Sequence, residues 1–222
     1  MPTRLTATMH ISTVDRLRLT QWLSPAFPIG SFAYSQGLEQ AIIDGHVTCA
    51  DTLQDWVRAV LCLGSGRMDG ILLAHARYPD ADSPSLADLA YAHAGSAERW
   101  LEMRDQGAAF GRTVTALTGD VQPPLPYAVA VGHATRSLAL DTEDVLSLFL
   151  QGLAAQQIAA AVKFVPLGQT AGQEVLGQLG PVIATLAPQL GVAPLSDLAN
   201  ACLGADLAQM RHETMDVRIF RS

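Results

Sequence analysis

The longest apolar run of the chain, VLSLFLQGLAAQQIAAAVKFV at residues 145–165, limits the possible folds more than any other feature. Its length approaches that of a membrane-spanning helix. However, Gln151, Gln156, Gln157 and Lys163 fall inside it, and polar groups without partners are costly in hydrocarbon. The run therefore predicts a buried helix in the core of a helical bundle, and no membrane association is expected.

Helical patterns continue along most of the chain. In residues 52–63, TLQDWVRAVLCL, apolar side chains recur on one helix face; Asp51 is expected to cap this helix, with Gln54 placed to return the bond. Ser83 and Pro84 are typical of a helix start and predict one helix over residues 84–107. GSGR at residues 64–67 is interpreted as a helix C-terminal turn. Further helices are predicted at residues 69–76, 108–117, 127–138, 173–179, 181–190 and 195–210.

No long linker, low-complexity tract or internal repeat divides the sequence. We therefore predict an all-α protein, a single-domain helical bundle with an extended C-terminal tail. The expected organisation is a flexible N-terminal segment at residues 1–13, a helical domain at 14–210 and a partner-binding tail at 211–222.

Composition indicates a protein with a large core, exposed apolar patches, or both. Apolar residues make up 49% of the 222 residues, charged residues only 16%, and the mean hydropathy is +0.22. Self-association or a protein partner is the natural expectation. The net charge of −7 argues against nucleic-acid binding, which needs clustered cations.

The three cysteines, Cys49, Cys62 and Cys202, lie far apart and form no CxxC pair. They predict reduced core thiols rather than a disulfide framework or a zinc site. The N-terminal sequence MPTRLTATMHIST lacks the apolar stretch of a signal peptide. A cytoplasmic protein is expected.

No complete catalytic or metal-binding motif is present in the sequence. HETMD at residues 212–216 resembles the zinc motif HExxH, but Asp216 occupies the second ligand position and no third ligand follows. His46 and Cys49 form only an isolated HxxC pair. A phosphate-binding P-loop and a GxSxG motif are absent. We therefore predict no catalytic residue, no bound metal, no cofactor and no enzymatic activity.

The segment SPAFPIGSFAYSQGLEQAI at residues 24–42 stands out instead. Pro28 is expected to end the preceding element, Gly30 to allow a tight turn, and Ser31 to cap a helix that carries Ser35, Leu38 and Glu39. Gly37 inside that helix would cost about 0.5–1 kcal/mol relative to alanine, which indicates close approach of another backbone. Helix packing alone can account for Gly37 and Leu38. A contact surface is an equally good interpretation for Phe32, Tyr34 and Ser35.

A second unusual segment, AAAVKFVPLGQTAGQ, spans residues 159–173 and holds Lys163, the only lysine of the chain. Pro166 is expected to end the long helix, and Gly168 and Gln169 to follow in a turn. Lys163 either caps the last helix carbonyls or contributes a cation to an interface.

The C-terminal segment HETMDVRIFRS is the third unusual feature. Met215, Val217 and Ile219 alternate with polar residues, which predicts an extended strand-like segment rather than a helix. Chain ends are usually polar, so these apolar side chains together with Phe220 indicate that something covers the tail. It either packs on its own domain or binds a partner.

Three of these segments, PIGSFAYSQGLE, AAVKFVPLGQTAGQ and RHETMDVRIFRS, resemble the UreF family of urease accessory proteins in sequence, order and position. AERWLEMRDQGAAFGR and PYAVAVGHATRSLAL also fit, so the resemblance spans nearly the whole chain. It implies an all-helical, non-catalytic maturation factor that forms a homodimer. Its implied partners are UreD, also called UreH, the GTPase UreG and apo-urease, to which the assembly delivers nickel.

The resemblance also suggests which residues contact partners. The tail is expected to be loose in the free protein, to be ordered by UreD and to present Arg218 to UreG, because burial of apolar side chains can repay the ordering entropy. The complete set of candidate contact residues is Phe32, Ser35, Lys163, His212, Glu213, Val217, Arg218, Ile219, Phe220 and Arg221.

An alternative interpretation comes from another functional class. Small-residue helices can surround a pocket, as in an all-helical ligand-binding or regulatory domain. A regulator that binds DNA would show a helix-turn-helix with a basic face, and the sequence contains none.

Overall fold

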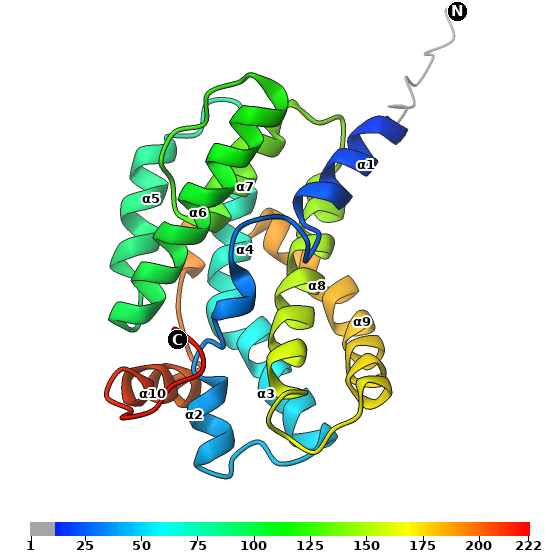
Figure 1. Ribbon diagram of the computed structural model, residues 1–222. Helices are drawn as coiled ribbons and strands as arrows, with labels where there is room; N and C mark the ends of the chain where they lie inside the picture. Colours follow the sequence, from blue (N-terminus) through cyan, green and yellow to red (C-terminus); the bar gives the residue numbers. More distant parts are fainter. Residues whose placement is uncertain (1–11) are drawn as a thin grey trace, which may run out of the picture.

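The computed structural model describes residues 12–222, and this part of the chain is all-α, with ten α-helices, three 3-10 helices and no strand (Figure 1). The α-helices are α1 (Thr13–Trp22), α2 (Leu38–Ile43), α3 (Ala50–Leu63), α4 (Ser65–Ala76), α5 (Ser83–Ala92), α6 (Ala97–Thr118), α7 (Tyr127–Ala134), α8 (Thr142–Ala161), α9 (Gln169–Val192) and α10 (Leu203–His212). The 3-10 helices are η1 (Ser31–Ala33), η2 (Thr135–Ser137) and η3 (Leu195–Asp197). The predicted fold class is thus confirmed.

The centre of the fold is α4, which contacts α3, α5, α7, α8 and α9. Most of its residues are buried, including Ile71, Leu72 and Leu73. Small residues allow the close packing: a Cβ added at Gly132 of α7 would lie 2.4 Å from the carbonyl oxygen of Leu73. Because α4 is enclosed on several sides, its neighbours share one continuous core.

The long apolar run forms α8, and the prediction of a buried core helix is confirmed. Val145, Leu146, Leu150 and Ala154 are fully buried, and α8 packs mainly against α9. In the described residues, α9 is the helix whose length and hydropathy alone would permit a membrane span, a test that core helices also pass. Its stripe of Val175, Leu179, Ile183 and Leu190 is buried inside the bundle.

Several helix boundaries differ from the predictions. Residues 84–107 do not form one helix: α5 begins at Ser83 behind an Asp82 cap and ends at Ala92, and α6 begins anew after the Ser96 cap. Gly64 of the segment GSGR is the C-cap of α3, as predicted, but the same residue is also the N-cap of α4, which begins at Ser65. Residues 173–179 and 181–190 belong to one helix, α9, which continues through Pro181 and Pro188.

The caps and ends of other helices also need correction. The cap of α3 is Cys49, paired with Thr52 in a capping box, not Asp51 with Gln54. Residues 195–210 divide into η3 and α10, and α10 continues to His212, beyond the predicted domain boundary at 210. Ser12 caps α1 and Thr13 already begins it, whereas residues 1–11 of the predicted flexible segment lie outside the described residues.

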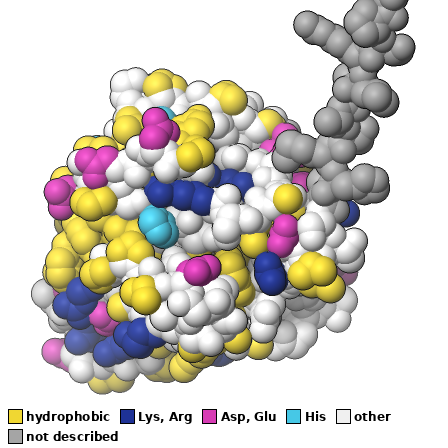
Figure 2. Space-filling model, turned by 90° about the horizontal axis from the view of Figure 1, so that it is seen from above, with side chains coloured by type: hydrophobic (Ala, Val, Ile, Leu, Met, Phe, Trp, Pro, Cys, Tyr) yellow, Lys and Arg dark blue, Asp and Glu magenta, His cyan; other side chains and the backbone are white. Residues whose placement is uncertain are grey.

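The surface combines charged residues of both signs with apolar side chains. Figure 2 shows basic, acidic and apolar side chains interspersed over the face seen from above. Among the described residues 12–222, the most exposed large apolar side chains include Phe32, Val217 and Ile219. These three belong to two of the three segments that stood out in the sequence.

Candidate functional site

The segment before α2 is irregular rather than helical. Pro28 lies in an exposed bend, Gly30 adopts a left-handed conformation (φ 74°), and Ser31 begins η1, which ends at Ala33. Tyr34 is extended, so the prediction of one helix running from Ser31 through Ser35 and Leu38 is wrong. The helix begins only at Leu38.

Gly37 is the N-cap of α2 and lies against the backbone of α10. Its φ is 78°, in the left-handed region, and a Cβ built there would lie 2.7 Å from the amide nitrogen of Gln209. The predicted close approach of another backbone is therefore confirmed, although Gly37 caps the helix instead of lying inside it. Leu38 is completely buried, as its packing role requires.

The tail packs against this segment. The Arg221 amide donates to the Ala33 carbonyl (2.7 Å), and the Ser35 amide donates to the Ser222 carbonyl oxygen (2.7 Å), which also accepts the Ser35 hydroxyl. Residues 213–222 form turns and bends rather than a strand. The expectation of a tail that is loose without a partner is wrong for this structure, in which Phe220 and Ser222 are buried against their own domain.

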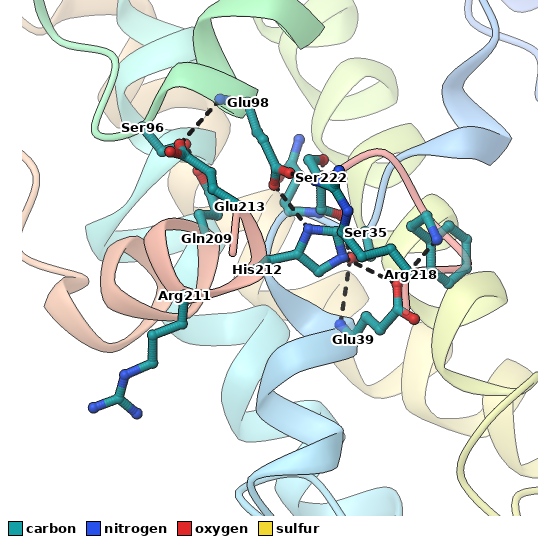
Figure 3. Close-up of polar contacts among 12 residues, drawn as sticks. Ser35, Glu39, Ser96, Glu98, Gln209, Arg211, His212, Glu213, Arg218 and Ser222 are labelled. Carbon is teal, nitrogen blue, oxygen red and sulfur yellow. Dashed lines mark hydrogen bonds and ion pairs between the residues drawn. The ribbon is translucent and has the colours of Figure 1, made fainter. Parts of the chain in front are cut away.

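A buried ion-pair cluster joins the tail to two helices (Figure 3). His212, at the end of α10, has no exposed surface; its Nδ1 lies 2.8 Å from Glu98 Oε2 and its Nε2 lies 3.0 Å from Glu39 Oε2. The Arg218 Nη1 donates to Glu98 Oε1 (2.7 Å). We call Glu39, Glu98, His212 and Arg218 the clasp.

The two carboxylates of the clasp have different electrostatic environments. Burial alone would raise the pKa of Glu39, but hydrogen bonds from the Phe220 amide, the His212 ring and the Ile219 amide hold it below its ordinary value. Burial raises the pKa of Glu98 above its ordinary value, although His212 and Arg218 both oppose the shift. Glu39 is therefore the carboxylate that the tail stabilises in its charged form.

Glu213 has a separate structural role. Its Oε1 accepts hydrogen bonds from the amides of Ala97 (2.7 Å) and Glu98 (3.3 Å), in the first turn of α6. An acidic side chain from the end of the domain thus stabilises the N-terminus of a distant helix, where the helix dipole favours negative charge. Glu213 is therefore engaged with its own chain, as is His212.

Other candidate residues surround the clasp with differing exposure. Phe32 is 77% exposed, Val217 78% and Ile219 68%, whereas Ser35 is completely buried. The predicted contact role of Ser35 is accordingly corrected: it holds the tail and is not accessible to a partner. Phe220 is buried as well, which removes it from the accessible set.

Two cations lie on the aromatic rings of this region. The ammonium of Lys163 is 5.3 Å from the centroid of the Phe220 ring, and the guanidinium of Arg221 is 5.9 Å from that of Tyr34. Lys163 follows the end of α8 and is exposed. Its two predicted roles were capping of the last helix carbonyls and an interface cation, and neither anticipated its contact with the tail. Beyond it, Pro166 and Gly168 precede Gln169, the first residue of α9.

Sequence reasoning missed a buried polar network beside the clasp. Arg99 pairs with Asp69 and with Oε2 of Glu102. The other oxygen of Glu102, Oε1, accepts hydrogen bonds from the side-chain amides of Gln36 (2.9 Å) and Gln106 (3.0 Å). Glu98 was missed as a partner of the tail. The polar residues at 98, 99, 102 and 106 recur at helical spacing within α6, which is the one signal that could have indicated a buried polar face.

Comparisons with known proteins identify the family of the chain. The family model UreF matches residues 47–180. A protein of Cereibacter sphaeroides named urease accessory protein UreF is 53% identical over 206 residues, which cover 93% of this chain and 98% of the relative. Proteins of the same name from Dinoroseobacter shibae and Roseobacter denitrificans are 49% and 45% identical, covering 93% and 98% of this chain and 98% of each relative. The chain therefore belongs to the UreF family of urease accessory proteins.

Proposed function

We propose that this chain is a cytoplasmic maturation factor for urease, without catalytic activity of its own, that forms a homodimer, binds UreD (UreH), recruits and modulates UreG, and helps deliver nickel to apo-urease. The names of the relatives support the link to urease, and the family resemblance supplies the partners. The observation that carries the proposal on this chain is an apolar and basic surface next to the clasp, with which it shares the partly exposed Arg218. We call its accessible members, Phe32, Lys163, Val217, Arg218, Ile219 and Arg221, the tail surface.

Contact with UreD is assigned to the apolar part of the tail surface. Val217 and Ile219 lie on either side of Arg218 and are both mainly exposed, while Phe220 next to them is buried in the domain. The domain thus holds the tail backbone in place and leaves two large apolar side chains in water. A partner that covers them gains hydrophobic burial without ordering a disordered segment.

Contact with UreG is assigned to the cations. Arg218 pairs with Glu98, yet its side chain remains 42% exposed, so part of the guanidinium is available to a carboxylate or carbonyl of a partner. Lys163 and Arg221 add positive charge on the same surface. Charges at the rim of an interface mainly govern the rate of encounter and specificity, which suits the transient recruitment of a GTPase.

Co-purification tests the first contact. The double variant Val217→Asp, Ile219→Asp should lose UreD binding by more than about tenfold, because two charges replace apolar contacts. The matched control is Val121→Asp with Val192→Asp, since these valines are 84% and 83% exposed and lie elsewhere. Equal binding by both double variants would exclude the tail surface as the UreD contact.

Recruitment of UreG needs a separate comparison, because Arg218 also belongs to the clasp. Arg218→Ala should reduce UreG capture by the complex with UreD while UreD stays bound. Glu98→Gln removes the partner of Arg218 but keeps its guanidinium, so it should preserve UreG capture. If both variants lose UreG equally, displacement of the tail rather than a direct contact is responsible.

Catalytic activity and dimerisation are tested on the chain alone. The purified protein should not hydrolyse GTP, because the sequence contains no phosphate-binding P-loop. Light scattering should give twice the mass of one chain. Turnover that co-elutes with the pure chain, or a monomeric mass at micromolar concentration, would contradict the corresponding part of the proposal.

A further inference from the structure

A cavity of about 300 Å³ lies behind the loop that joins α1 to α2, and it has no role in the proposed function. Its walls come mainly from α8 and from the loop, with Leu23, Ile29, Phe149 and Leu153 among the apolar side chains. In Figure 1 the loop crosses in front of the bundle beside α8. A volume of this size falls in the range of small-molecule sites.

The inner part of the cavity is polar and carries an excess of negative charge. Asp69 and Arg99 line it, and Arg99 pairs with both Asp69 and Glu102. Two carboxylates therefore share one guanidinium. All three side chains are at least nine-tenths buried, so water screens the remaining negative charge only weakly.

Hydrogen-bonding capacity remains open at the same place. Tyr127 lines the cavity, and its hydroxyl makes no hydrogen bond with any residue of the described chain, 12–222. Within that same part of the chain, Asp69 accepts a hydrogen bond on one carboxylate oxygen only. The side-chain amide of Gln106 donates a hydrogen bond to Glu102, while its carbonyl oxygen accepts none from the described residues. Burial and the charge of Asp69 raise the pKa of Tyr127, which is consistent with a negative potential here.

The mouth of the cavity has the opposite charge. Lys163 and Phe32 contribute to the lining, and both are exposed members of the tail surface. A cationic ligand is therefore repelled by Lys163 at the mouth and attracted by Asp69, which lines the inner part, and by Glu102, which is not in the lining but pairs with Arg99. Its apolar body would lie along the wall that α8 provides.

We propose that this cavity binds a small organic cation, a primary ammonium group on a compact apolar body, with the ammonium directed to Asp69 and Tyr127. An ammonium group supplies three hydrogen-bond donors for acceptors that lack partners, and its charge balances the surplus carboxylate. This inference is independent of the proposed function, because it concerns the isolated protein and a small molecule, and no partner protein takes part.

Calorimetric titration of the purified protein with three probes of similar shape tests the assignment. Cyclohexylmethylamine should bind saturably, cyclohexylmethanol at least about tenfold more weakly, and cyclohexanecarboxylate not at all, because charge-assisted hydrogen bonds are the stronger ones. No saturable binding of the amine, or equal binding of the alcohol, would overturn the proposal.

Two pairs of variants locate the site. Tyr127→Phe should weaken the amine about two- to tenfold and leave folding intact, because its hydroxyl has no partner in the described chain. The half-buried Tyr91, which stacks on Trp100, supplies the control Tyr91→Phe, for which no change is expected.

The second pair fills the cavity. Gly152 lines it, and an added Cβ would meet only the Leu23 carbonyl oxygen at an ordinary 3.7 Å, so Gly152→Leu should fold and abolish binding of the amine. Gly177→Leu, at an exposed position of α9 with nothing within 4 Å of a Cβ, should bind as the parent does. Full binding by a folded Gly152→Leu protein would place the amine elsewhere and refute the site; should that variant not fold, the Tyr127→Phe result decides.

Discussion

Individual residues of the clasp are matched in charge and in hydrogen-bonding geometry. Both ring nitrogens of His212 face carboxylate oxygens, and only the imidazolium form can donate through both at once. The His212 ring lies between the two carboxylates, and Arg218 pairs with one of them, Glu98. Buried charges are tolerated when each has such a partner, and removing one partner is costly because it leaves the other unpaired.

Glu39→Gln tests the contribution of one carboxylate to the clasp. Glutamine keeps the shape but presents an amide where the Ile219 and Phe220 amides and the His212 ring now donate. We expect a loss of about 1–3 kcal/mol in the free energy of unfolding, the usual cost of leaving buried donors unpaired. Urea unfolding measures it, with Glu174→Gln on the exposed side of α9 as the control. An equal effect of both substitutions would contradict the clasp.

Acidification should act on the same residue. The pKa of Glu39 is lowered on folding, so its contribution to stability is complete above the ordinary carboxyl value of 4.5 and is lost as the pH falls through the folded-state value. Glu98, whose pKa is raised, contributes with the opposite sign. The melting temperatures of the parent and of the Glu39→Gln variant should therefore converge as the pH falls below 4.5. A constant difference in melting temperature across that range would show that the contacts with the tail do not stabilise the ionised form of Glu39.

Among the helices, local sequence patterns correctly predicted those whose formation depends on interactions between nearby residues. The apolar run of α8 and the one-sided pattern of α3 depend on neighbours within a few turns, and both helices were found. The break between α5 and α6 was missed although its N-cap, Ser96, is a local signal; only the second support of the start of α6, Glu213, is more than a hundred residues away. The continuity of α9 through Pro181 was missed because its packing against α8 and α4 holds it together, whereas Pro188 already lay inside a predicted helix.

Gly37→Ala tests the contact between α2 and α10. The substitution should destabilise the protein by clearly more than Gly30→Ala, because both glycines have a positive φ but only Gly37 has a neighbouring backbone within 3 Å of the added Cβ. The control should show only the conformational cost of a left-handed alanine, about 1–2 kcal/mol. Thermal unfolding of the two variants gives the difference. Equal losses would mean that α10 moves aside at no cost.

For the molecule as a whole, the sequence indicated which segments matter but not how they meet. The candidate contact residues came from three segments of unusual sequence, which contain Phe32, Lys163 and residues 212–221. The fold brings these three segments together. The contacts of His212 and Arg218 with Glu98 span more than a hundred positions, and no motif marked Glu98. Whether Ser35 or Phe220 faces a partner or the core also depends on this long-range packing, so exposure could not be predicted from the alternation of residues in the tail.

Removal of residues 216–222 tests the connection between the tail and the domain. The truncated protein should remain helical, because Phe220 is the only one of the removed residues that belongs to the hydrophobic core. It should nevertheless lose stability, since the truncation removes buried Phe220, the Arg218 ion pair and two amide donors to Glu39. Burial of one phenylalanine alone contributes about 1.5–3 kcal/mol. We expect the melting temperature to fall by about 5–10 °C, from about 2–4 °C per kcal/mol in a chain of this size.

The matched control alters the tail without touching its buried side. Val217→Ser with Ile219→Ser changes two mainly exposed side chains and should leave the unfolding free energy within about 0.5 kcal/mol of the parent. Both proteins should bind UreD poorly, because each lacks the apolar part of the tail surface, yet only the truncation should lower the melting temperature. A truncated protein that melts like the parent would mean that the tail is not held by the clasp in solution, and the exposed apolar residues would then be ordered by the partner after all.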